Sequence, residues 1–90
     1  MQNNLEQLRK KIDALDKKIL TTLSERLATA EKIGKIKKMT GKNITDLQRE
    51  RELFALHQAW AEDLQLPEKL VIKLFKLILQ QSKKIQKICK

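Results

Sequence analysis

The residues of this sequence best suited to chemistry are cations that interrupt an apolar stripe. Arg26 comes three residues after Leu23 and seven before Ile33, at a position where an aliphatic side chain is expected. Lys37 follows Arg26 by eleven residues, about 20° from three full turns of an α-helix, so both cations point the same way. Snorkelling, in which the stem covers apolar surface and the head reaches water, would explain either cation alone. The two together favour a pair that binds an anion.

Two polar clusters could complete such a site. Asp46, Arg49 and Glu50 are spaced i, i+3 and i+4, so they share one helix face. The alternative for this cluster is a helix cap with a weak surface ion pair. Ser82 and Gln86 lie four residues apart and continue the apolar stripe of a later segment. The alternative for Gln86 is fraying towards a wet C-terminus.

Arg9 is a separate case. It precedes Arg26 by seventeen residues, which is about 25 Å along a helix axis and about 100° around it. One chain therefore cannot bring both arginines to one pocket. We expect Arg9 to contribute across a dimer interface.

The element that carries these cations is expected to be one long helix over residues 5–39. Its apolar positions recur at intervals of three and four, as in an amphipathic helix, and they are Leu5, Leu8, Ile12, Leu15, Ile19, Leu23, Ala30 and Ile33. Gly34 costs about 1 kcal/mol relative to alanine but need not end the helix. The helix would be about 50 Å long. The rest of the chain cannot cover a rod of that length, so a second copy of the chain is predicted to do so.

Two shorter helices are expected over residues 46–64 and 67–87. Thr45 and Asp46 are both good N-caps for the first of them, and Thr45 with Gln48 matches a capping box. Pro67 suits the first position of the other helix. Strand alternation and internal repeats are absent from the sequence, so we predict a single all-α domain over residues 1–90.

Composition narrows the class of protein. Of 90 residues, 41% are apolar and 34% charged, which is typical of neither a disordered nor a membrane-spanning chain. The lone cysteine, Cys89, suits a reducing cytoplasm, and we expect no export. We interpret the net charge of +9 as a coat of lysines that cover the surface and face water. A basic helical dimer that binds nucleic acid is the alternative, although aromatic residues for base stacking are scarce.

Other chemistries are poorly supported. A single histidine, His57, and a single cysteine give no metal cluster and no catalytic triad. The two glycines are isolated, so no phosphate-binding loop is present. We therefore expect an enzyme that uses bound charges and hydrogen bonds, with no metal, no cofactor and no covalent intermediate.

Taken in order, the motifs of this chain resemble those of the all-α chorismate mutases of the compact bacterial type. The resemblance covers about residues 5–86. The motifs that carry it are Leu8-Arg9, Glu25-Arg26, Gly34-x-x-Lys37, Asp46-x-x-Arg49-Glu50 and Ser82-x-x-x-Gln86. It implies an intertwined homodimer in which the long helices pair and each active site draws on both chains. The implied reaction is the Claisen rearrangement of chorismate to prephenate, on the route to phenylalanine and tyrosine.

The resemblance also implies roles for eight residues. Arg26 and the partner chain's Arg9 would clamp the two carboxylates of the substrate. Lys37 would reach a carboxylate and the ether oxygen, to which Gln86 would also donate. Glu50 would accept a hydrogen bond from the substrate hydroxyl near Asp46. Ser82 would contact a carboxylate, and Arg49 would organise the site.

An isochorismate pyruvate-lyase of the same fold is the nearest alternative. The complete Asp46-Arg49-Glu50 cluster favours the mutase. A non-catalytic regulatory relative is disfavoured by the intact polar set. Feedback regulation, and membership of a larger bifunctional enzyme, are not encoded in any motif.

Overall fold

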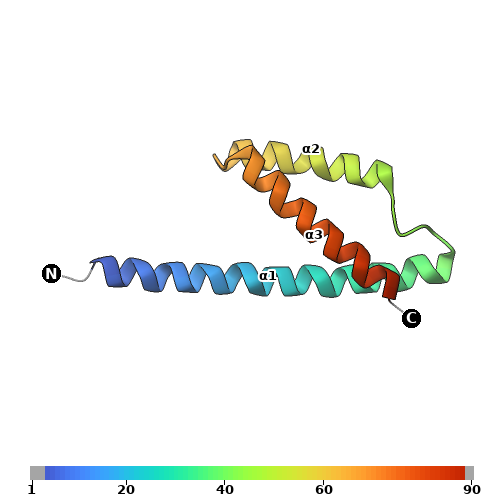
Figure 1. The fold of residues 1–90 in the computed structure, drawn as a ribbon, viewed down its shortest axis with the longest axis horizontal. Helices are drawn as coiled ribbons and strands as arrows, with labels where there is room; N and C mark the ends of the chain where they lie inside the picture. Colours follow the sequence, from blue (N-terminus) through green and yellow to red (C-terminus); the bar gives the residue numbers. More distant parts are fainter. Residues whose placement is uncertain (1–3, 89–90) are drawn as a thin grey trace.

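The computed structural model describes residues 4–88 and gives an all-α chain (Figure 1). The described residues form three helices, α1 (Asn4–Thr40), α2 (Leu47–Asp63) and α3 (Glu68–Ile88). Each helix end lies within one residue of the end expected from the sequence. Cys89 falls outside the described residues.

Helix α1 ends in a Schellman motif built on glycine. Gly41 has a φ of +70°, a left-handed conformation that glycine adopts without a Cβ clash. Its N–H donates to the carbonyl of Lys38 at 3.4 Å, and the N–H of Lys42 donates to the carbonyl of Lys37 at 2.8 Å. The chain therefore leaves the helix sharply, and the short connection to α2 turns back over the last turns of α1.

The N-cap of α2 is Asp46, and the capping box expected at Thr45 is wrong. Asp46 has extended backbone angles, and its carboxylate accepts a hydrogen bond from the backbone N–H of Arg49 at 3.0 Å. A carboxylate at this position also interacts favourably with the positive end of the helix dipole. In α3 the helix begins at Glu68, one residue after Pro67, whose carbonyl accepts from the N–H of Val71 at 3.2 Å.

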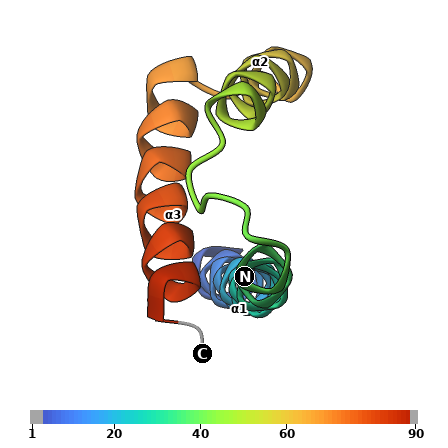
Figure 2. The same cartoon turned by 90° about the vertical axis from the view of Figure 1, so that its right-hand side faces the viewer.

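Helix α3 holds the chain together. It packs against α2 near its own N-terminus and crosses the C-terminal half of α1 near its C-terminus (Figures 1 and 2). Among residues 4–88, α1 and α2 do not pack directly against each other. The result is an open, elongated arrangement of 61 × 28 × 15 Å, with the N-terminal half of α1 projecting beyond the other helices (Figure 1).

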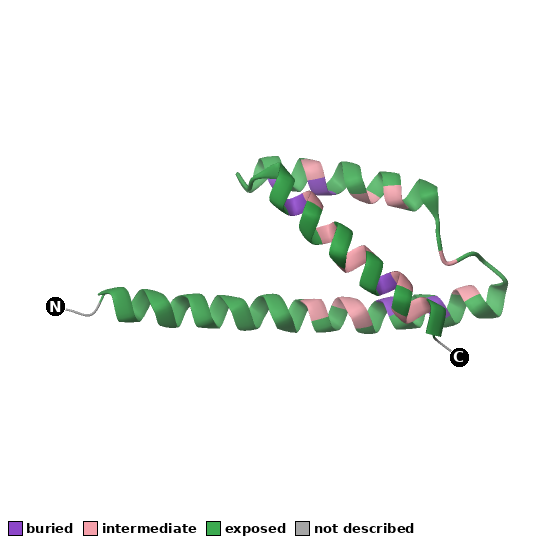
Figure 3. Ribbon diagram, in the orientation of Figure 1, coloured by how far each residue is buried: buried purple, intermediate pink, exposed green. Residues whose placement is uncertain are grey.

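The core is small. Its buried apolar side chains are Ala30 in α1, Ala61 in α2 and Val71 in α3. These positions cluster where α3 meets each of the other helices (Figure 3). No large side chain among the described residues is completely buried.

The apolar stripe of α1 is left largely uncovered. Leu5, Leu8, Ile12 and Ile19 are all between 56% and 61% exposed, along a helix of 37 residues. A contiguous exposed apolar surface of this kind marks an interaction site in a folded protein. In the part of the chain that the structure describes, no helix is long and apolar enough to cross a membrane.

Candidate active site

A cavity of about 410 Å³ lies where the C-terminal half of α1, the start of α2 and the end of α3 meet. This volume is typical of a small-molecule site. The charged and polar side chains that line it are Arg26, Thr29, Lys37, Asp46, Arg49, Glu50, Ser82, Lys83 and Gln86. Apolar residues, among them Ile33 and Leu79, form the rest of the wall.

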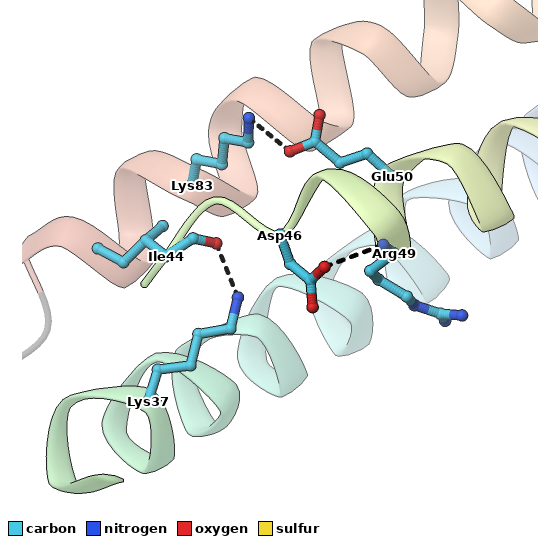
Figure 4. A network of polar contacts seen from close by, with 6 residues as sticks. All are labelled: Lys37, Ile44, Asp46, Arg49, Glu50 and Lys83. Carbon is cyan, nitrogen blue, oxygen red and sulfur yellow. Dashed lines mark hydrogen bonds and ion pairs between the residues drawn. The ribbon is translucent and has the colours of Figure 1, made fainter. Parts of the chain in front are cut away.

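Lys37 is fixed at one end of the cavity. Its ammonium donates to the backbone carbonyl of Ile44 at 2.7 Å (Figure 4). Ile44 lies in the connection between α1 and α2, so this bond ties that connection to α1. An ammonium has three N–H donors, so two remain for a ligand once Ile44 has taken one.

Arg26 is fixed by α3. Its Nη1 donates to the hydroxyl oxygen of Ser82 at 2.8 Å, and that hydroxyl donates in turn to the carbonyl of Ile78 at 2.8 Å. Ser82 is only 3% exposed. Burial, and to a lesser degree the nearby Arg49 guanidinium, lower the pKa of Arg26 below its usual value. A bound anion would offset both unfavourable effects.

The first turn of α2 presents two carboxylates to the cavity. Asp46 caps the helix, and Glu50 lies one turn further on (Figure 4). The Glu50 Oε2 atom is 2.7 Å from the ammonium of Lys83 on α3. That oxygen is buried, and among the described residues no donor meets it in hydrogen-bonding geometry. The ammonium thus compensates the negative charge of an oxygen that lies away from solvent.

Gln86 completes the wall at the crossing of α1 and α3. Its Oε1 atom is buried without a hydrogen-bond partner among the described residues. The α3 backbone approaches α1 closely here, because Gly34 is buried and has no side chain. A Cβ on Gly34 would lie 2.9 Å from the Cα of Gln86 and 3.0 Å from its Cγ. Gly34 therefore sets how near Gln86 comes to α1.

A second cavity of about 250 Å³ adjoins the first and shares Arg26 and Glu50 with it. His57 lines this second cavity and is buried, stacked on Phe75 with the ring centres 3.8 Å apart. Burial lowers the pKa of His57 below 6.5, and the positive charges of Arg26 and Arg49 lower it further. His57 is therefore neutral at neutral pH.

The structure brings seven of the eight site residues expected from the sequence to one cavity. Arg9, near the start of α1, is not among the lining residues. The sequence analysis missed Lys83, which it treated as part of the lysine coat, and the part played by Gly34. The position of Lys83 beside Ser82 in the sequence does not indicate its ion pair with Glu50. That ion pair depends on where α2 lies relative to α3. Within residues 4–88, no three His, Cys, Asp or Glu side chains are grouped as a metal ion would require.

Comparisons with known proteins agree on one family. The model of the family described as chorismate mutase type II matches residues 8–87. A chorismate mutase from Methanocaldococcus jannaschii is 32% identical over 87 residues, which are 97% of this chain and 88% of that protein. A bifunctional chorismate mutase/prephenate dehydratase from Escherichia coli K12 is 36% identical over 81 residues.

The relatives differ in length. The match covers 90% of this chain but only 21% of the bifunctional E. coli protein. Among solved structures, a conserved hypothetical protein from Pyrococcus furiosus superposes with a TM-score of 0.71 at 35% identity, covering 96% of this chain and 99% of that one. The fold is therefore shared over nearly the full length of both chains.

Proposed function

The chain belongs to the chorismate mutase type II family, a family of isomerases, and we propose that it converts chorismate to prephenate in the cavity of about 410 Å³. The product lies on the route to phenylalanine and tyrosine. One observation carries the proposal for this chain. Arg26, Lys37, Glu50 and Gln86, which come from three helices, line a single cavity of suitable size.

The reaction is a rearrangement within one molecule, so the site requires no nucleophile. It requires the flexible substrate to be held in a compact, reactive conformation, which positioned side chains can supply. It also requires partial positive charge near the ether oxygen, which becomes negative as its C–O bond breaks. Both requirements suit a cavity lined by fixed cations and amide groups.

Arg26 is proposed to bind a substrate carboxylate. A guanidinium matches a carboxylate with two parallel hydrogen bonds, and such charge-assisted bonds are stronger than neutral ones. Ser82 takes one N–H of Arg26, which leaves other N–H groups of the guanidinium for the ligand. The lowered pKa of Arg26 supports this role, because it reports a cation that lacks a counter-charge.

Lys37 and Gln86 are proposed to act on the ether oxygen. The hydrogen bond to Ile44 holds the Lys37 ammonium in place with two further N–H groups. Gln86 would donate to the ether oxygen through its amide Nε2. Its buried Oε1 is an acceptor without a partner among the described residues, and it needs a donor from the substrate or from ordered water. Gln86 is neutral at ordinary pH, so we expect no acid-side requirement for protonating this position.

Glu50 and Asp46 are proposed to surround the substrate hydroxyl. Glu50 pairs through Oε2 with the Lys83 ammonium at 2.7 Å, and its carboxylate has further lone pairs that can accept a hydrogen bond from the substrate hydroxyl. Arg49 forms its ion pair with Glu52, at 3.5 Å, and not with Glu50. Ser82 is proposed to act near a carboxylate, and its contact with Arg26 gives it that position.

We further propose that the working form is an intertwined homodimer in the cytoplasm. A second copy of α1 would cover the exposed stripe that includes Leu5, Leu8 and Ile12. It would also bring its own Arg9 to the cavity, as the second carboxylate ligand. The distance of Arg9 from Arg26 along α1 supports an assignment to the other chain's site.

The test is a direct assay of purified protein, following the loss of chorismate and the appearance of prephenate. Wild type is expected to be active, and Lys37→Ala to lose at least about a hundredfold in kcat, as expected when a group that stabilises developing charge is removed. Lys38→Ala is the matched control, because Lys38 is exposed and does not line the cavity. An inactive wild type contradicts the proposal, and pyruvate release from isochorismate would indicate a lyase instead.

A further inference from the structure

Lys83 lines the active-site cavity, although it has no part in the function proposed above. It follows Ser82 on α3, and its ammonium lies 2.7 Å from Glu50 Oε2 on α2. The two side chains are 28% and 25% exposed. This ion pair is therefore more sheltered than the pairs of Lys35 with Glu31 and of Arg49 with Glu52, whose side chains are all more than half exposed.

We propose that Lys83 is a positioning residue, whose charge holds the Glu50 carboxylate at the cavity wall, oriented to receive the substrate hydroxyl. This inference rests on the function proposed above and adds a residue to it. Partial burial of a carboxylate costs free energy unless a nearby opposite charge or hydrogen bonds replace its lost hydration. Lys83 supplies that charge at 2.7 Å from Oε2.

The other charged groups of the two cavities do not replace Lys83. The guanidinium of Arg26 is directed to Ser82, and the ammonium of Lys37 to Ile44. Arg49 pairs with Glu52. Asp46 is an acid, His57 has a lowered pKa, and Lys76 lines the second cavity from α3 without an ion pair to Glu50. Among the described residues, only Lys83 lies within 4 Å of the Glu50 carboxylate as a cation.

Two other roles for Lys83 make different predictions. If its ammonium bound a substrate carboxylate directly, its removal would matter whether or not Glu50 was present. If the ion pair only stabilised the packing of α2 on α3, its removal would lower the melting temperature without a specific effect on turnover. A double-mutant cycle with Glu50 separates these roles, since it measures how far one residue acts through the other.

The experiment compares kcat and KM for wild type, Lys83→Met, Glu50→Gln and the double variant. In the wild-type background, Lys83→Met is expected to lower kcat/KM about tenfold, within the range of coupling between contacting charges. In the Glu50→Gln background, the same change is expected to lower it less than about twofold. Lys83→Arg keeps the charge and is expected to retain most of the activity. Lys84→Met is the matched control, because Lys84 is the exposed neighbour of Lys83.

Each outcome decides the matter. Equal losses in both backgrounds, or no loss in the wild-type background, overturn the positioning role. If Lys83→Met does not fold, as judged by circular dichroism, then Lys83→Arg decides, because an ion-pair role requires it to stay active. If wild type itself does not consume chorismate, the proposed function fails. If wild type is active and Lys83→Met is equally active, only the present inference fails.

Discussion

Arg26 on α1 and Ser82 on α3 are joined by a hydrogen bond of 2.8 Å, although 56 residues separate them in the sequence. Ser82 donates its own hydrogen to Ile78 one turn earlier, so its oxygen presents a lone pair to the guanidinium. The bond thus fixes both the distance between the helices and the direction of the arginine. It links the packing of α3 on α1 to the orientation of the proposed anion-binding group.

Removing the Ser82 hydroxyl is expected to weaken both substrate binding and stability. Ser82→Ala leaves Arg26 without its fixed partner, and a hydrogen bond to a charged group contributes about 1.5–3 kcal/mol. We expect kcat/KM to fall about tenfold or more, chiefly through KM, and the melting temperature to fall by roughly ten degrees. Steady-state kinetics and thermal melts measure both. Ser24→Ala, at an exposed position of α1, is the control, and an unchanged KM in Ser82→Ala would contradict this view.

A methyl group on Gly34 is expected to impair catalysis by moving Gln86. Alanine gains about 1 kcal/mol in helix propensity over glycine, but its Cβ would lie 2.9 Å from the Cα of Gln86. Overpacking of this kind costs about 1–3 kcal/mol, so the net change in stability should be modest. A displaced Gln86 should lower kcat by roughly ten- to a hundredfold.

Gly41→Ala is the companion variant. Its added Cβ meets nothing within 4 Å, but the φ of +70° strains any side chain. It should lower the melting temperature while leaving kcat near the wild-type value. If Gly34→Ala retained full kcat, Gly34 would have no part in placing Gln86.

Mixing two inactive variants is expected to restore activity if Arg9 serves the partner's site. In a dimer of one Arg9→Ala chain and one Lys37→Ala chain, one site would contain both changes and the other neither. Random exchange of chains should then give about a quarter of wild-type activity, since about a quarter of all sites would be intact. The assay follows chorismate loss after the chains have been unfolded and refolded together. If Arg9 served its own chain's site, every site would carry one change and no activity would return.

The buried His57 is expected to make stability fall in acid. Because its pKa is lowered by folding, the unfolded chain binds a proton at higher pH than the folded chain does. Its contribution to stability is therefore complete above pH 6.5 and is lost as the pH falls below that value. Melting temperatures from about pH 8 to about pH 5 should drop more steeply for wild type than for His57→Phe, which keeps a ring against Phe75. Parallel curves for the two proteins would count against this assignment.

Much of the fold could be predicted because apolar residues spaced three and four apart identify the buried face of a helix. The apolar positions from Leu5 to Ile33 predicted α1, and the shared phase of Arg26 and Lys37 predicted that both would face one cavity. The long stripe also indicated that a single chain leaves apolar surface exposed. These inferences need only the geometry of one helix.

Other features depend on how far apart two helices lie, and spacing does not encode that distance. The pairing of Lys83 with Glu50 and the approach of Gly34 to Gln86 both arise from the placement of α3. Asp46, and not Thr45, is the N-cap of α2. Which of the two caps the helix depends on the path of the chain between Gly41 and α2. Each of these needed the three helices in place.

The bare N-terminal half of α1 has a thermodynamic consequence. Its leucines and isoleucines are largely exposed in a single chain and gain little free energy from burial there, so folding of the proposed homodimer would include a bimolecular step. The melting temperature should then rise with protein concentration, by mass action. Dilution of the proposed dimer would destabilise α1 and remove the partner's Arg9 from the site. Specific activity per chain would then decline together with stability.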